Sequence, residues 1–120
     1  MEPTTTQMRS TDFSTDLLDA TAMQIAETIL TAAYAHRGTE NLSGGGCLAF
    51  YDAEDWAGRR EDHGNGAPLV VVHDGGSLAS FFNWDYEDTA AVAAVDKALA
   101  AIGYYAEQCT CWFTAIYKIG

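Results

Sequence analysis

The sequence predicts an α+β domain in which two helices pack on a mostly antiparallel sheet. A chain of 120 residues is long enough to bury one core and too short for two. Hydrophobic residues make up 48% of it, which excludes a disordered acidic chain. Two segments have the apolar period of a helix and the others have strand patterns, so we expect the order α-β-β-β-α-β-β in two layers. Residues 1–11 form a flexible polar arm in this prediction, and residues 12–120 form the single domain.

The first helix is predicted over residues 13–37. A serine or threonine, Thr11 or Ser14, can supply its N-cap oxygen. Gly38 is suited to the left-handed conformation that ends a helix. The apolar side chains that recur at spacings of three and four are Phe13, Leu17, Leu18, Ala22, Ile25, Ile29, Leu30 and Ala33.

Strands are predicted next, at residues 47–51 and 69–73. The second run is apolar and β-branched on both faces, which is typical of a central strand. A turn at 74–77 then predicts a hairpin over 68–84, with 78–83 as its returning strand. The polar, glycine-containing stretch 52–68 is a surface loop or holds a short helix around residues 54–56.

The second helix opens with the acidic tetrapeptide at 85–88 and ends before Gly103. Its apolar stripe consists of Val92, Val95, Leu99 and Ile102. Residues 104–108 and 112–119 follow as two strands, and residues 108–111 form the turn between them.

The termini and the cysteines predict a cytoplasmic protein. The first residues have no basic segment followed by an apolar run, so we expect no secretory signal. Apolar runs are far shorter than the roughly 20 residues that cross a bilayer. Three cysteines, an odd number, indicate reduced thiols.

The charge of the chain excludes direct binding of nucleic acid and points to a basic partner. There are 17 acidic against 6 basic residues, a net charge of -11, whereas contacts to phosphates need clustered lysine and arginine. A negative surface of this kind can meet a basic protein and imitate a row of phosphates. The alternative is an ordinary solvated surface that limits aggregation. Only Arg59 and Arg60 oppose the nine acidic residues of the middle segment, which are Asp52, Glu54, Asp55, Glu61, Asp62, Asp74, Asp85, Glu87 and Asp88.

The residues predicted to contact a partner come from this acidic segment. Aromatic side chains interleave with it at Tyr51, Trp56, Trp84 and Tyr86, and Trp and Tyr dominate binding hot spots. The predicted partner-binding set is Asp52, Glu54, Asp55, Trp56, Asp85, Glu87 and Asp88.

No catalytic constellation is visible, so we expect no enzyme, no cofactor and no metal. The glycine triplet 44–46 lacks the Lys-Ser/Thr of a phosphate-binding loop. Cys109 and Cys111 are not spaced as a usual zinc pair. One alternative is a small-molecule or nucleotide-binding protein, or a minor enzyme, that uses the glycine loops 44–46 and 74–76. Another possibility is a homodimer that pairs through an exposed edge strand at 112–119.

Several tracts resemble small acidic proteins encoded by phages of actinobacteria. The tracts are 72–78, 82–86, 106–112 and 115–117, and the N-terminal half adds only 48–52. The resemblance implies a protein that binds a host or phage macromolecule, and it implies no catalytic residues. We therefore expect a binding protein that blocks a basic surface of a host protein, such as a nuclease, a restriction or CRISPR component or a DNA-repair enzyme. Such a protein can act as a nucleic-acid mimic or an anti-defence inhibitor.

Overall fold

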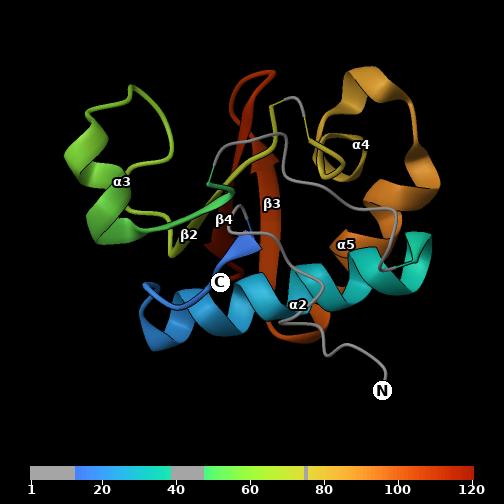
Figure 1. Cartoon of the computed structure of the whole chain (residues 1–120), viewed down its shortest axis with the longest axis horizontal. Coiled ribbons are helices and arrows are strands. Elements are labelled where there is room, and N and C mark those ends of the chain that lie inside the picture. The colour runs from blue at the N-terminus through green and yellow to red at the C-terminus, as the bar shows by residue number, and fades with distance from the viewer. Residues whose placement is uncertain (1–12, 39–47, 75) are drawn as a thin grey trace.

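A computed structural model describes residues 13–38, 48–74 and 76–120 (Figure 1). The predicted N-terminal arm and the glycine triplet 44–46 lie outside these residues. The described elements are α2 (Ala20–Arg37), β1 (Phe50–Asp52), α3 (Ala53–Arg59), β2 (Leu69–Val72), α4 (Ala79–Phe82), the 3-10 helix η3 (Trp84–Tyr86), α5 (Thr89–Ala101), β3 (Tyr104–Gln108) and β4 (Phe113–Lys118).

The sheet has four strands in the order β1-β2-β4-β3, and every neighbouring pair is antiparallel. Leu69 of β2 lies opposite Asp52 on one side and Ile116 on the other. The predicted α+β class, with helices on an antiparallel sheet, is confirmed.

Both faces of the central strand β2 are covered. Leu69 and Val71 belong to the larger core, which is built with α2, α4 and α5. Val70 and Val72 point to the opposite face, where Trp56 of α3 and Ala67 cover them. All four residues of β2 are buried, so its predicted central position is confirmed. The short helix α3 adds a partial layer on the second face.

Helix α2 begins later than the predicted residue 13. Asp19 is its N-cap, and the Asp19 Oδ1 atom accepts a hydrogen bond from the Ala22 amide at 2.8 Å. Of the two predicted caps, Ser14 is not used and Thr11 lies outside the described residues. Leu17 precedes the helix and is 85% exposed, so its predicted place in the apolar stripe is wrong. The helix ends at Gly38, with φ at 94°, as predicted.

The predicted hairpin over 68–84 is wrong, because residues 79–82 form helix α4 instead of a strand. Both edges of β2 are already taken, by β1 and by β4. No edge of β2 therefore remains for a returning strand. Phe81 and Phe82 bury their rings in the larger core from the helix.

The C-terminal third follows the prediction more closely. Helix α5 begins at Thr89, after the cap Asp88 rather than at residue 85. Gly103, with φ at 88°, separates it from β3. Strands β3 and β4 pair as predicted. Because β4 lies between β2 and β3, the prediction that 112–119 is an edge strand for a homodimer is wrong.

Candidate functional site

The seven predicted partner-binding residues fall into two separate groups. Asp52, Glu54, Asp55 and Trp56 lie at the start of α3, at one end of the long axis in Figure 1. The group 85–88 lies between α4 and α5, toward the other end. The structure therefore separates the seven residues into two clusters.

Asp52 is a structural residue rather than a contact for a partner. Its side chain is 7% exposed. The Oδ1 atom accepts a hydrogen bond from the Asp55 amide at 3.0 Å and so caps α3, and the Oδ2 atom accepts one from the Asp19 amide at 3.2 Å. Both carboxylate oxygens thus satisfy amides at the starts of helices, which corrects the prediction.

The prediction that Trp56 contacts a partner is also corrected, because its side chain is fully buried. Its indole Nε1 donates to the His63 carbonyl at 2.8 Å. Its ring centroid lies 4.8 Å from that of Phe113, and the Arg59 guanidinium carbon lies 5.4 Å from its centroid. The ring is the centre of the smaller core. The sequence did indicate that a side chain such as Trp56 would be buried, because a strand that is apolar on both faces needs a covering layer on each face.

Glu54 and Asp55 are exposed, in the first turn of α3. Carboxylates at this position interact favourably with the positive end of the helix dipole. Their location is therefore explained by the stability of α3 without reference to a partner.

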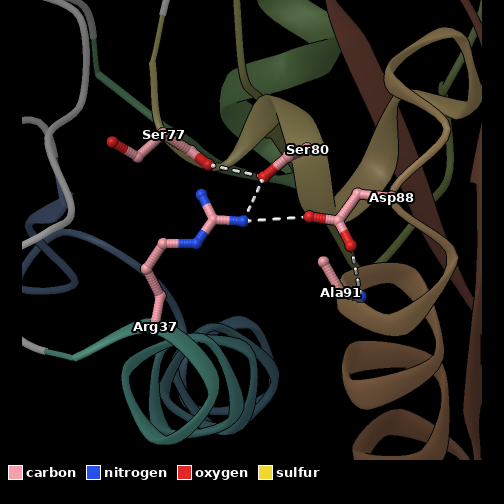
Figure 2. Close-up of polar contacts among 5 residues, drawn as sticks. All are labelled: Arg37, Ser77, Ser80, Asp88 and Ala91. Carbon is pink, nitrogen blue, oxygen red and sulfur yellow. Dashed lines mark hydrogen bonds and ion pairs between the residues drawn. The ribbon is translucent and has the colours of Figure 1, made fainter.

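Asp88 joins three elements, as Figure 2 shows. Its Oδ1 atom caps α5 by accepting from the Ala91 amide at 3.1 Å, and its Oδ2 atom lies 3.1 Å from Nη2 of Arg37. The same Nη2 donates to the Ser80 hydroxyl at 3.0 Å, and the Arg37 guanidinium carbon lies 5.0 Å from the Phe81 ring centroid. The carboxylate of Asp88 is thus committed to holding α2, α4 and α5 together.

The remaining predicted residues, Asp85 and Glu87, lie in a different environment. Both are exposed, and they alternate with Trp84 and Tyr86, whose side chains are each 57% exposed. We call residues 84–87 the aromatic-acidic segment. The predicted set did not include Trp84 and Tyr86, because sequence alone does not distinguish an aromatic ring in a core from one at the surface.

A hydrogen-bonded base holds the aromatic-acidic segment in place. Asn83 is buried, and its Oδ1 atom accepts from the Asp85 amide at 3.0 Å and from Gln108 Nε2 at 3.1 Å. Its Nδ2 atom donates to the Cys111 carbonyl at 3.1 Å. The Trp84 amide donates to Gln108 Oε1 at 3.1 Å. The segment is therefore fixed to the β3–β4 hairpin, and little backbone entropy is left to lose on binding.

Glu87 adds a local strain at the end of this segment. Its φ of 56° places a non-glycine residue in the left-handed region, which costs about 1 kcal/mol. The amide of Glu87 donates to the Trp84 carbonyl at 3.0 Å and closes the turn. The acidic side chain is thus carried at a position where glycine or asparagine is usual.

His73 is the described ionisable group with the most altered titration. It is buried, its ring stacks on Phe82 with centroids 5.8 Å apart, and its Nε2 lies 3.0 Å from Thr114 Oγ1. Its Nδ1 atom has no hydrogen-bond partner within the described part of the chain. Burial lowers the pKa of His73 to about 4, against a smaller raising effect from Asp74. The ring is closed off from solvent, so this histidine does not reach an external substrate.

Cys109 lies at the turn of the last hairpin. Burial raises the pKa of the Cys109 thiol, which keeps it in the protonated, weakly nucleophilic form. Within the described ranges, no three His, Cys, Asp or Glu side chains gather as a possible metal site.

A groove of about 430 Å³ runs along α2, and none of the residues described above in this subsection lines it. Ala98 of α5 contributes one wall, and Glu27 is the one ionisable residue in the lining. Its remaining walls are made by Gln24, Thr28, Thr31, Ala32 and Ala35. Neither Asp74 nor Gly76 lines it. Gly75 and the other glycine loop, 44–46, lie outside the described residues, so a pocket at the glycine loops stays a prediction.

None of the helices in the described ranges is both long and apolar enough to cross a membrane. No protein-family model, curated protein or solved structure matches the chain.

Proposed function

We propose that this protein is a small acidic, phage-type binding protein that docks on a basic surface of a host protein and blocks it. The docking site is the aromatic-acidic segment, residues 84–87. The proposal includes no catalytic turnover and places the protein in the cytosol of the host cell.

The observation that carries the proposal is the exposure of two large aromatic side chains on a rigid base. Trp84 and Tyr86 are each more than half exposed, although the other aromatic residues of the middle segment contribute to the folded core or pack beside it. Trp and Tyr supply large contact areas at a low entropic cost, and such residues dominate binding hot spots. Two exposed rings on one anchored turn therefore support a docking role.

The charges around the rings support a basic partner. Asp85 and Glu87 stand beside the rings, and the chain as a whole carries a net charge of -11. Carboxylates at the rim of an interface steer association and disfavour acidic partners. The burial of Asp52 and the ion pair of Asp88 with Arg37 leave fewer free carboxylates for imitating a long row of phosphates. A compact docking site, rather than a nucleic-acid mimic, is therefore the form of inhibition that we favour.

Binding from an actinobacterial lysate, followed by measurement with the purified partner, tests the proposal. The immobilised protein is exposed to lysate at low and at high salt, and each captured protein is identified and purified. We expect the double variant Trp84→Ala/Tyr86→Ala to bind the purified partner at least about tenfold more weakly, as for loss of hot-spot side chains.

The matched control is Tyr105→Ala, which removes an aromatic side chain that is 45% exposed on β3. This variant should bind like the unmodified protein, and thermal melting should show that all variants remain folded. A partner that binds the double variant unchanged, or whose affinity is insensitive to salt, would contradict the proposal.

A further inference from the structure

We infer that the aromatic-acidic segment recognises an arginine side chain of its partner, in preference to lysine. This inference rests on the proposed function and specifies the chemistry of the docked group. The guanidinium lies on an exposed aromatic ring and turns its N–H edge toward a carboxylate of the same turn.

The protein already uses this arrangement within its own fold. Arg37 lies over the ring of Phe81, with the guanidinium carbon 5.0 Å from the centroid, while its Nη2 atom pairs with Asp88. Arg59 lies over Tyr51 and Trp56, at 5.1 and 5.4 Å from their centroids. At Arg37 an aromatic ring together with a carboxylate holds the guanidinium, and at Arg59 two aromatic rings hold one. Figure 2 shows the ion pair between Arg37 and Asp88.

The backbone of the segment provides the same two groups at its surface. The hydrogen bond from the Glu87 amide to the Trp84 carbonyl closes a turn, and the Cα atoms at the ends of such a turn lie within about 7 Å of each other. A planar guanidinium can cover a ring and reach a carboxylate over that distance. The second pair, Asp85 and Tyr86, follows on the next positions of the same turn.

Arginine fits these groups better than lysine for physical reasons. The guanidinium is planar and weakly hydrated, stacks on aromatic faces and donates two parallel hydrogen bonds to one carboxylate. The ammonium of lysine is a compact, strongly hydrated charge, so it gains little from an exposed ring. Both side chains carry the same charge, and the general attraction to an acidic protein is therefore equal for the two.

Two peptides of equal length and charge, oligoarginine and oligolysine, provide the test. Isothermal titration at one ionic strength should show the arginine peptide binding about three- to tenfold more tightly than the lysine peptide. In the nitrogen–proton spectrum, the indole resonance of Trp84 should shift on addition of oligoarginine, whereas that of the buried Trp56 should not.

Variants separate the ring from the charge. Trp84→Leu keeps an apolar side chain but removes the aromatic face, and Glu87→Gln keeps the size but removes the carboxylate. Each should reduce the preference for arginine toward equality. The matched controls are Tyr105→Leu, an exposed ring elsewhere, and Glu54→Gln, which removes one charge at the other end of the molecule, and both should keep the preference.

The outcomes distinguish this inference from the proposed function. Equal affinity for the two peptides, together with weaker binding of both by Glu87→Gln, overturns the arginine preference and leaves docking on a basic surface intact. Binding of both peptides that no variant of the segment alters places the site elsewhere and overturns both proposals. A preference for arginine that persists in Trp84→Leu overturns the stacking mechanism.

Discussion

At the scale of single residues, two glycines in the loop after α3 have the same conformation but different surroundings. Gly64 and Gly66 both have positive φ values, 86° and 85°. A Cβ added at Gly64 would lie 2.9 Å from the Trp56 indole nitrogen, whereas one at Gly66 would meet nothing within 4 Å. The pair therefore separates backbone strain from crowding of the core.

We expect Gly66→Ala to cost about 1 kcal/mol of unfolding free energy, from backbone strain alone. Gly64→Ala should cost about 2–4 kcal/mol, because it also displaces the buried indole from the His63 carbonyl. Chemical denaturation of the two variants measures both values. Equal losses of unfolding free energy in the two variants would show that the side chains around Trp56 can shift to accept the added methyl group.

His73 makes the stability of the protein depend on pH in the acid range. The pKa of its ring falls from 6.5 to about 4 on folding, so between these values the unfolded chain binds a proton that the folded chain does not. Stability is therefore complete above pH 6.5 and declines as the pH falls toward 4, by up to about 3 kcal/mol.

Denaturation at a series of pH values measures this decline. His73→Gln removes the titrating ring and should flatten the curve in that window, while His63→Gln, an exposed histidine, should leave its slope unchanged. The same slope in His73→Gln would assign the acid sensitivity to other groups.

At the scale of elements, Asp88 links the start of α5 to Arg37 of α2. Asp88→Ala removes both the cap and the ion pair and should cost about 1–2 kcal/mol of unfolding free energy. Asp88→Asn keeps a capping oxygen and loses only the charge, so its cost should stay below about 1 kcal/mol. Thermal or chemical unfolding measures both, with Asp62→Ala as a control at an exposed carboxylate. A larger effect for asparagine than for alanine would contradict the capping role.

Elements that local patterns define were predicted well, and those that depend on distant partners were not. The β3–β4 hairpin and Gly103 at the end of α5 follow from local sequence, and so does the burial of β2. The segment 78–83 was assigned to a strand because a turn sequence precedes it. Its actual helical form depends on β4, which occupies the edge of β2 from far along the chain. The start of α2 was missed because Phe13 and Leu18 are buried although neither belongs to this helix.

At the scale of the whole molecule, the prediction of the candidate site was limited for the same reason. Acidic residues that are concentrated in sequence between 52 and 88 lie at both ends of the long axis. Asp52 and Asp88 are used as helix caps, and among the described residues of 52–88 it is 84–87 that combines carboxylates with exposed rings. Residue type and spacing located the negative charge in the sequence. Neither indicates which carboxylates cap helices or form ion pairs within the folded chain.

The net charge of -11 should itself lower the stability of the folded protein at low salt. Self-repulsion among the carboxylates is screened as ionic strength rises. We therefore expect the melting temperature to rise with added sodium chloride and to the same extent with potassium chloride. Differential scanning calorimetry measures this shift. A fall in melting temperature, or a difference between the two salts, would contradict general screening.

The position of β2 between β1 and β4 has a consequence for the order of folding. Helix α5 and strands β3 and β4 follow one another along the chain through short connections, so their contacts close small loops and can form early. Strand β2 pairs with β4 only after a much longer loop closes. During synthesis on the ribosome, α2, β1 and α3 are completed before β2, whereas β4 emerges well after it, so the edge of β2 that pairs with β4 stays unpaired in the interval. We expect pulsed hydrogen exchange to show the amides of β3 and β4 protected first and those of β2 last.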